Sequence, residues 1–282
     1  MTESGGAGIS GQLIDRYAVI GDPIAHSKSP LIHATFAEQT GESLTYTRIR
    51  GEPGRFPETV RAFFHEGGSG LNVTVPFKEE AWALADQLSA RAASAGAVNT
   101  LIPLPDGQIR GDNTDGAGLV RDLTINHGFL LSGSRVLLLG AGGASRGVVR
   151  PLLEQGPEHL TIANRTAIKA ESLAKSLEGL GSVDGCGLDE LNGRRFDLII
   201  NGTASGLSGA VPEIPVDLLA PGGWTYDMMY STEPTAFVLW GRARGAGEAL
   251  DGLGMLVEQA AESFLLWRGI RPETAPVIDL LR

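Results

Sequence analysis

A glycine-rich string at residues 140–147, GAGGASRG, is the part of this sequence best suited to hold a charged ligand. The apolar run at 136–139 precedes it and predicts a buried parallel strand, and a helical stretch follows it. Glycines allow a sharp turn and close approach of bare backbone to a phosphate, while the first helical amides point partial positive charge toward it. The string predicts a pyrophosphate site for a dinucleotide, formed by Gly140, Ala141, Gly142, Gly143, Ala144 and Ser145.

Ser145 stands where this motif usually has its third glycine. A small residue still permits close packing of the helix on the strand, so the departure weakens the match without breaking it. The alternative is an ordinary strand, turn and helix packed for stability. Another glycine-rich string, GGAGISG at 5–11, follows no strand, and we expect residues 1–14 to be mobile and to carry no chemistry.

Cationic and polar side chains follow the next predicted strand, at 159–163. Asn164, Arg165 and Thr166 end that strand, Lys169 lies one turn further on, and no acidic residue occurs before Glu171. An NAD-binding unit usually places an acid here to accept hydrogen bonds from the ribose hydroxyls. Two cations suit the extra phosphate of NADP instead. The sequence therefore predicts NADP as cofactor, against the alternative of a solvated helix start.

Other polar residues lie on loops where predicted strands end, which is where sites are commonly built. In GDPIAHSKSP (21–30), Ser29 is predicted as a helix N-cap before Pro30, and the hydroxyls of Ser27 and Ser29 would suit a small carboxylate. Lys78 ends NVTVPFK (72–78), and a lone lysine is usually a solvated surface residue. Asn99 lies at a strand end. Asp115 in GDNTDGAG could equally be a helix cap.

Composition limits the class of protein. The chain has 282 residues, 42% of them hydrophobic, and a formal charge of −10, which disfavours nucleic-acid and membrane-surface partners because both are polyanionic. No apolar run is long enough to span a membrane and no leader is evident, so we expect a cytoplasmic protein. Cys186 is the single cysteine, expected to be a buried or bystander thiol. The five histidines are scattered, and no metal site is expected.

Alternating strand and helix patterns along the chain predict an α/β protein. Strands are expected at 17–20, 44–49, 71–75, 136–139, 159–163, 196–200 and 224–228, and helices at 56–66, 116–128, 234–245 and 251–270. In an open α/β sheet, ligands gather at the carboxyl ends of the strands. In the long amphipathic helix, Gln259 is a polar side chain on an otherwise apolar stripe, so it needs a hydrogen-bond partner once buried.

Taken together, the strings GDPIAHSKSP, GLNVTVPFKE, AGAVNTL, GDNTDG, GAGGASRG, NRT, DMMY and DGLGMLVEQA resemble shikimate dehydrogenases over nearly the whole chain, from about residue 17 to 282. The resemblance implies an N-terminal α/β substrate domain, a Rossmann-like NADP-binding domain, and a C-terminal helix that returns to the substrate domain. The expected division is 1–116 with 251–282 for the substrate domain, and 117–250 for the cofactor domain.

The resemblance also implies an activity: NADP-linked interconversion of 3-dehydroshikimate and shikimate, in the pathway to aromatic compounds. Lys78 and Asp115 match the family's catalytic pair. The expected substrate residues are Ser27, Ser29, Thr74, Lys78, Asn99, Asp115, Tyr230 and Gln259. Besides the residues named above, Thr203, Met228 and Gly252 are expected on the cofactor side. The protein is expected to be a monomer or a homodimer that binds a small-molecule substrate.

Two other functions remain open from sequence. A quinate/shikimate dehydrogenase using NAD is disfavoured by Arg165 and Lys169 and by the serine pair at 27 and 29. A non-catalytic NADPH-binding regulator on the same scaffold is disfavoured because both Lys78 and Asp115 are present.

Overall fold

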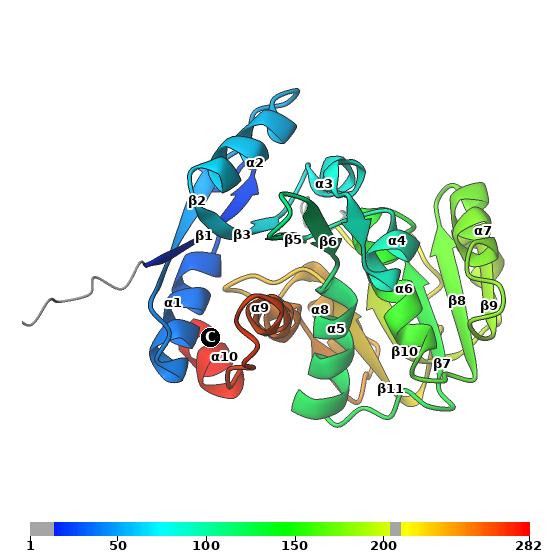
Figure 1. The fold of residues 1–282 in the computed structure, drawn as a ribbon. Coiled ribbons are helices and arrows are strands. Elements are labelled where there is room, and N and C mark those ends of the chain that lie inside the picture. Colours follow the sequence, from blue (N-terminus) through cyan, green and yellow to red (C-terminus); the bar gives the residue numbers. More distant parts are fainter. Residues whose placement is uncertain (1–13, 204–209) are drawn as a thin grey trace, which may run out of the picture.

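The computed structural model describes residues 14–203 and 210–282, and it contains two six-stranded sheets joined by a pair of helices (Figure 1). Of residues 1–14, which the sequence predicts to be mobile, all but Ile14 lie outside the described residues, and so do residues 204–209 in the loop after the strand expected at 196–200. In the described part of the chain, no helix combines the length and hydrophobicity that a membrane crossing needs.

The first sheet is mixed and has the strand order β2-β1-β3-β5-β6-β4. β1 runs parallel to both β2 and β3, whereas β5 is antiparallel to β3 and β6. Its core is an apolar cluster between the sheet and α2, with Phe56, Leu71 and Phe77 fully buried. Its elements are β1 (Asp15–Gly21), α1 (Ser29–Thr40), β2 (Leu44–Arg50), α2 (Phe56–His65), β3 (Gly68–Val73), α3 (Lys78–Leu84), β4 (Gln87–Leu88), α4 (Ala90–Ala95), β5 (Thr100–Pro103) and β6 (Ile109–Asp112).

The second sheet is parallel throughout and has the order β12-β11-β10-β7-β8-β9. In chain order this is 6-5-4-1-2-3, the doubly wound order whose switch point lies between β7 and β10. Its elements are β7 (Arg135–Leu139), α6 (Gly143–Leu153), β8 (His159–Asn164), α7 (Ala167–Lys175), β9 (Val183–Gly187), η2 (Leu188–Leu191), β10 (Phe196–Asn201), β11 (Leu219–Asp227), α8 (Ala236–Ala243) and β12 (Ala249–Leu250). The chain enters this half through α5 (Asp115–Arg121) and a π-helical turn, η1 (Asp122–Asn126).

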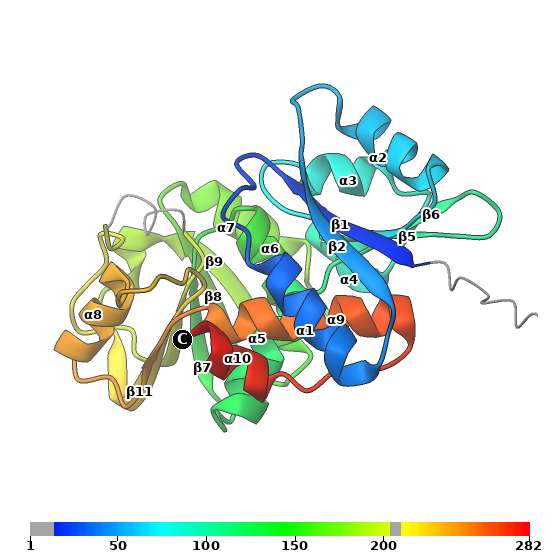
Figure 2. The same cartoon turned by 90° about the vertical axis from the view of Figure 1, so that its left-hand side faces the viewer.

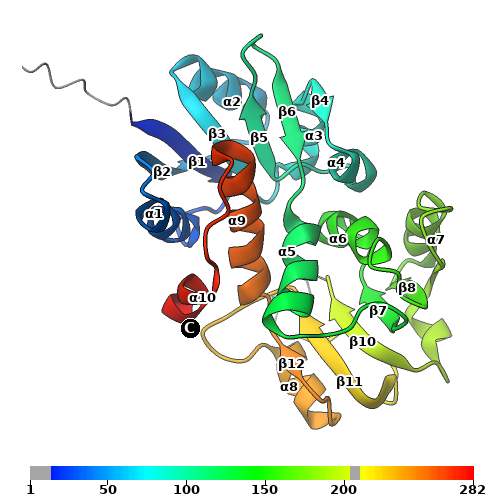
Figure 3. The same ribbon diagram turned by 60° about the horizontal axis from the view of Figure 1, so that its bottom comes forward.

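The C-terminal helices return to the first half. α9 (Leu253–Arg268) lies between the first sheet and α5, and α10 (Ala275–Leu281) follows it (Figures 2 and 3). Phe264 and Val257 of α9 form one apolar cluster with Ile32 and Phe36 of α1. The predicted α/β fold, with a second Rossmann-type sheet and a returning C-terminal helix, is therefore confirmed.

Three local predictions need correction. Ser29 is the first residue of α1 rather than its N-cap: Lys28 occupies the cap position without a side-chain cap, and the Ser27 hydroxyl accepts the Ser29 amide instead. The strand expected at 71–75 runs from Gly68 to Val73, because the chain leaves the ladder before Pro76, which has no amide to donate. The helix expected at 116–128 starts at Asp115 and changes into the π-helical turn at Asp122.

Candidate active site

A lysine and an aspartate from different ends of the first half meet in an ion pair. Lys78 is the first residue of α3 and Asp115 the first residue of α5, and Lys78 Nζ lies 2.6 Å from Asp115 Oδ2. The two side chains are only 24% and 9% exposed, so solvent screens the pair weakly. Asp115 does not cap α5 through its carboxylate, and its other oxygen accepts a hydrogen bond from Asn99 Nδ2 at 2.9 Å.

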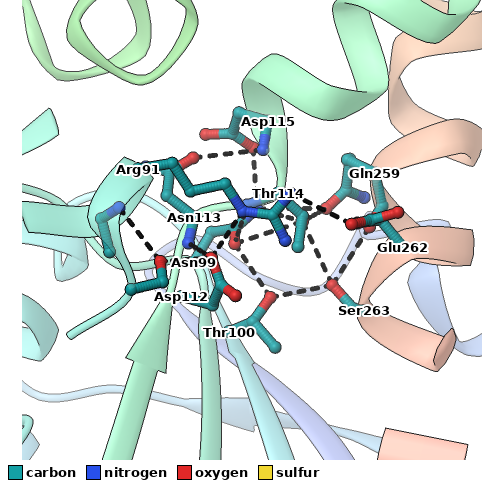
Figure 4. Close-up of polar contacts among 12 residues, drawn as sticks. Arg91, Asn99, Thr100, Asp112, Asn113, Thr114, Asp115, Gln259, Glu262 and Ser263 are labelled. Carbon is teal, nitrogen blue, oxygen red and sulfur yellow. Dashed lines mark hydrogen bonds and ion pairs between the residues drawn. The ribbon is translucent and has the colours of Figure 1, made fainter. Parts of the chain in front are cut away.

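Asn99 is the hub of a hydrogen-bond network that includes Asp115 of this pair (Figure 4). Its amide also approaches Gln259 Oε1 at 3.3 Å, and its oxygen accepts from the Thr114 amide at 2.9 Å. Gln259 in turn donates to the Leu256 carbonyl at 2.7 Å. The partner that sequence reasoning required for Gln259 is therefore present, and Asn99, Thr114, Asp115 and Gln259 form one connected group.

Three further polar residues lie beneath this group, and sequence analysis did not single them out. Asn72 Nδ2 donates to Thr100 Oγ1 at 3.2 Å and to Ser263 Oγ at 3.0 Å, and the Ser263 hydroxyl lies 3.2 Å from that of Thr114. Ser263 follows Gln259 by one helical turn, so the two share one face of α9. The four-residue spacing of Gln259 and Ser263 could have identified Ser263 from the sequence. The burial of Thr100 could not be predicted in this way, because it depends on how the sheet packs against α9.

A second ion-pair cluster borders the network. Arg91 of α4 donates from Nε to Asp112 Oδ1 at 2.6 Å and from Nη1 to Glu262 Oε1 at 3.0 Å, which links α4 to α9 (Figure 4). Asp112 also accepts from the Ser89 hydroxyl at 2.6 Å and lies directly before Asn113 in the chain. The cluster therefore fixes the strand end from which Thr114 and Asp115 project.

The serine pair lies on the loop between β1 and α1. Ser27 Oγ and Ser29 Oγ are 3.2 Å apart, and Ser29 is buried. The loop also approaches Thr74 closely: a Cβ on Gly21 would lie 2.4 Å from the Thr74 methyl group, so only glycine fits there. Thr74 is thus placed beside the serine loop, with its amide bonded to the Ile20 carbonyl at 2.9 Å.

Aromatic residues support the serine loop from below. Tyr46 donates to Asn72 Oδ1 at 2.7 Å, which connects the loop side to the polar network. Burial raises the pKa of Tyr46 well above its usual value, with Ser29 acting against that rise. His33 stacks on Tyr46 with ring centroids 4.2 Å apart. Burial lowers the pKa of His33 to about 3, so this imidazole is neutral.

Tyr230 is the substrate candidate that the structure does not bring into the network. It lies half-buried on the loop after β11, and its pKa is raised by burial. Within the described residues it shares no hydrogen bond with Lys78, Asn99 or the serine pair. It belongs to the second half of the molecule, across from the other substrate candidates.

The glycine string forms the predicted turn between β7 and α6. Gly140 has φ +102°, a conformation that side-chain-bearing residues rarely adopt. Gly142 is the N-cap of α6 with no side-chain cap, and Ala144 is exposed, so the first amides of an 11-residue helix are open to a ligand. Ser145 is fully buried and its hydroxyl points at the Gly202 carbonyl, 3.4 Å away, which ties the turn to the end of β10.

Arg165 and Lys169 extend into solvent at the end of β8 and the start of α7. Neither takes part in a salt bridge with any described residue. Asn164 is partly occupied, because its Nδ2 donates to the Thr166 carbonyl at 3.0 Å. Two unpaired cations beside an exposed glycine turn are what a phosphate-rich ligand requires.

The remaining cofactor candidates cluster at the ends of β10 and β11. Thr203 donates through its hydroxyl to Asn201 Oδ1 at 2.7 Å, and the Met228 amide donates to the Asn201 carbonyl at 3.0 Å. The Gly252 amide bonds to the Met229 carbonyl at 2.9 Å, and a Cβ on Gly252 would lie 2.4 Å from the Met228 carbonyl oxygen. Thr203, Met228 and Gly252 are therefore held together at one edge of the sheet.

A buried carboxylate at the junction of the two halves was not foreseen. Glu258 on α9 is fully buried and accepts from Arg271 Nη2 at 2.7 Å, Thr274 Oγ1 at 2.6 Å and Asn126 Nδ2 at 3.1 Å. Arg121 Nε lies 3.0 Å from the same carboxylate. These contacts fasten α9 to α5 and η1 one residue away from Gln259.

A second buried acid, Asp122, completes the junction. It accepts from the Tyr226 hydroxyl at 2.7 Å and from Asn126 Nδ2 at 2.8 Å, and burial raises its pKa. A Cβ on Gly254 would lie 1.9 Å from Asp122 Oδ1, so this carboxylate packs directly on the backbone of α9.

Metal and thiol chemistry find no support in the described residues. No group of three or more His, Cys, Asp or Glu side chains within them could hold a metal ion. Cys186 is buried and free, and burial raises its pKa to about 11, so it is a protonated, inert thiol.

Three family models match the sequence. Shikimate dehydrogenase substrate binding domain matches residues 19–101, Shikimate / quinate 5-dehydrogenase matches residues 124–208, and Shikimate 5'-dehydrogenase C-terminal domain matches residues 252–282. The first and third correspond to the first sheet and to the helices that return to it. The second covers β7 to β10, with the glycine turn and the cofactor candidates from Gly140 to Thr203, whereas Met228 and Gly252 lie beyond it.

Curated relatives and solved structures agree with these matches. A protein of Methylococcus capsulatus named shikimate dehydrogenase (NADP(+)) is 59% identical over 267 residues, which cover 95% of this chain and 96% of that protein. Shikimate 5-dehydrogenase of Thermus thermophilus, in complex with NADP(H) and shikimate, has a TM-score of 0.83 at 34% identity, covering 94% of this chain and 98% of that one. An Ael1 enzyme of Pseudomonas putida has a TM-score of 0.88 at 44% identity, covering 95% and 98%.

Proposed function

The chain belongs to the shikimate dehydrogenase family, and from this premise we propose that it catalyses the reversible NADPH-dependent reduction of 3-dehydroshikimate to shikimate. The ion pair of Lys78 and Asp115, 2.6 Å apart and largely buried, is the observation that carries the proposal. Relatives over 50% identical across the chain are named as NADP(+) enzymes, which supports NADP as the cofactor.

Lys78 would perform the proton step. Reduction of a ketone develops negative charge on its oxygen, and an ammonium beside that oxygen stabilises the charge and then protonates it. In the direction of oxidation, Lys78 would take the proton from the substrate hydroxyl. Asp115 accepts from Lys78 and from Asn99 on its two oxygens, so it holds the lysine in one orientation.

The remaining substrate residues would bind the ring and its carboxylate. Asn99 and Gln259 present amides beside the catalytic pair, and we propose that they read the ring hydroxyls. Ser27, Ser29 and Thr74 supply hydroxyls on the adjacent loop for the carboxylate. We propose that Tyr230 reaches the substrate from the second half only when the two halves approach each other, since it is separate from the network here.

The cofactor candidates fit an NADP molecule. The open amides at the start of α6 would hold the pyrophosphate, and Arg165 and Lys169, with Asn164 and Thr166 beside them, would hold the 2′-phosphate. Thr203, Met228 and Gly252 line the edge of the same sheet. When bound, the cofactor supplies the hydride.

We add proposals for the domain bounds, the oligomeric state and the cellular compartment. We propose that the substrate domain comprises residues 1–116 and 251–282 and the cofactor domain residues 117–250. We propose a monomer or a homodimer, to be measured by light scattering. A single, unpaired cysteine and NADP-linked reduction both suit a reducing compartment, and we propose the cytoplasm.

Initial rates of purified protein test the function in a two-by-two design, with shikimate or quinate against NADP+ or NAD+. We expect strong activity only with shikimate and NADP+. Comparable rates with quinate or NAD+ would instead assign the protein to the dual-specificity quinate/shikimate enzymes. No activity in any combination would contradict the proposal and favour an NADPH-binding regulator.

A further inference from the structure

The chain and its proposed substrate are both negatively charged, so the substrate has to approach against electrostatic repulsion. The formal net charge is −10, whereas shikimate is an anion at neutral pH, and a strongly acidic protein repels anions at long range. The serine and threonine hydroxyls that would bind the carboxylate carry no charge. If the proposed function is right, as this inference assumes, a nearby cation must compensate.

The edge strand β2 provides cations next to the serine loop. Tyr46, Arg48 and Arg50 alternate along β2, so their side chains lie on the same face of the sheet. Each reaches toward the segment 21–30. Tyr46 lies under Ser29 and Asn72, and Arg48 and Arg50 contact backbone or side-chain atoms of the loop itself.

Arg48 binds the backbone of Ser27, the first residue of the serine pair. Its Nε and Nη2 both donate to the Ser27 carbonyl oxygen, at 3.1 and 2.5 Å. The Ser27 hydroxyl accepts the Ser29 amide and lies 3.2 Å from the Ser29 hydroxyl. Fixing the Ser27 carbonyl therefore fixes the orientation of both hydroxyls.

Arg48 and Arg50 differ in how their charge is used. Arg50 Nε lies 3.1 Å from Asp22 Oδ1, so a carboxylate of the loop neutralises it. No salt bridge within residues 14–203 and 210–282 includes Arg48. A carboxylate bound to the Ser27 hydroxyl would lie within about one Debye length of the Arg48 guanidinium, roughly 8 Å at physiological salt.

We propose that Arg48 is the residue that makes this site selective for an anionic substrate, acting through Ser27. It positions the serine hydroxyls and leaves its charge free to attract the carboxylate of the substrate. It is a positioning and specificity residue, because no contact with the reacting atoms is required of it.

Steady-state kinetics of Arg48→Ala with shikimate and with its methyl ester test the proposal. The ester keeps the ring and the hydroxyls but has no charge. We expect Arg48→Ala to raise KM for shikimate about tenfold, with kcat within about twofold of the wild type and KM for NADP+ unchanged. The inhibition constant of the ester, measured against shikimate, should change less than about twofold.

Three variants serve as controls. Arg48→Lys keeps the charge and should recover most of the lost affinity. Arg50→Ala removes an arginine from the same face of β2 that contacts the same loop, and the KM of this variant should stay near that of the wild type because Asp22 already neutralises Arg50. Lys28→Ala removes the lysine of the loop itself, and a loss confined to this variant would overturn the assignment to Arg48.

Ionic strength supplies an independent readout. The wild-type kcat/KM for shikimate should fall as salt is raised, and the slope should be smaller in Arg48→Ala. An equal loss for shikimate and ester in Arg48→Ala would overturn the proposal, because it would show a loop defect without charge recognition. Wild-type enzyme that fails to oxidise shikimate would contradict the proposed function instead, so the two failures are distinguishable.

Discussion

The proposed substrate site and the proposed cofactor site, called the substrate side and the cofactor side below, differ in how their polar groups are satisfied. Lys78, Asp115 and Asn99 are each already hydrogen-bonded to neighbouring side chains of the protein. At the glycine turn, the helix amides are open, and Arg165 and Lys169 extend into solvent without ion-pair partners in the described part of the chain.

The difference concerns when each side becomes ordered. A closed network holds catalytic groups in place before substrate arrives, so little reorganisation is needed during the reaction. The cations and helix amides of the cofactor side find their hydrogen-bond and ion-pair partners only on the bound ligand. The free energy of these interactions therefore contributes to binding affinity. Changes within the network around Lys78, Asp115 and Asn99 should therefore affect turnover and stability, and changes at the glycine turn and its cations should affect cofactor binding.

Lys78→Ala gives the largest expected effect and tests the substrate side directly. Loss of the proton donor and of charge stabilisation should lower kcat about 10³- to 10⁴-fold, with KM for NADP+ within about threefold of the wild type. Stopped-assay rates and cofactor fluorescence titration measure the two quantities. A variant with near-normal turnover would remove Lys78 from the mechanism.

Glu258→Ala breaks the junction between the two sides. It leaves Arg121 without its partner and removes the acceptor of Arg271, Thr274 and Asn126, so the free energy of unfolding should fall by about 3–5 kcal/mol. Urea denaturation measures this loss. Glu154→Ala, which breaks the exposed pair with Arg150, should cost less than about 1 kcal/mol. Equal losses would show that the buried junction is no more important than a surface pair.

His33 makes the substrate side sensitive to acid. Its pKa is about 3 in the folded protein, below the unfolded value of 6.5, so its stabilising contribution is complete above pH 6.5 and is lost as pH falls toward 3. At pH 5 the loss should be about 2 kcal/mol. His33→Phe keeps the stacking on Tyr46 and should abolish this part of the loss, measured by urea denaturation at pH 7.5 and 5.

The exposed His65 offers a matched control for that experiment. His65→Phe removes a histidine from the end of α2 and should leave the acid-induced loss in place. If both variants lose stability with acid as steeply as the wild type, another group causes the acid sensitivity.

Arg165→Ala should have the smallest effect, confined to one cofactor. Loss of a phosphate contact should raise KM for NADP+ about tenfold. The KM for NAD+, which is expected to be higher in the wild type, and the kcat for shikimate should stay nearly unchanged. Rates with both cofactors measure this. Lys169→Ala should act in the same direction, and an equal loss with NAD+ would show that neither cation reads the 2′-phosphate.

The sequence predicted the cofactor side more completely than the substrate side. Gly140 to Ser145 are consecutive, and Arg165 follows the next strand, so local periodicity was enough to place them. The substrate side brings together segments as distant as Ser27, Asn99 and Gln259, and only the resemblance to a known family connected them. Their hydrogen bonds to Thr100 and Ser263 depend on how sheet and helix pack, which periodicity does not report.

Buried charge was the other feature beyond reach of the sequence. Glu258 adjoins Gln259 on an amphipathic helix, where a glutamate is normally predicted to face solvent. Its partners at 121, 126, 271 and 274 come from three separate segments of the chain, so the sequence does not show that they meet it in the interior. The misplaced cap at Ser29 has a more local cause. The Ser27 hydroxyl competes for the Ser29 amide, and residue type alone does not say which serine accepts it.

The return of α9 to the first sheet also determines the order in which the protein can become complete during synthesis. Ile32 and Phe36 leave the ribosome early, yet their partner Phe264 follows the entire second sheet. At about 5–20 residues per second, that apolar surface stays uncovered for roughly 11 to 46 s. The apolar face of α1 therefore stays open to other partners until α9 is made, and the core of the second sheet is also completed only when Met255 of α9 arrives.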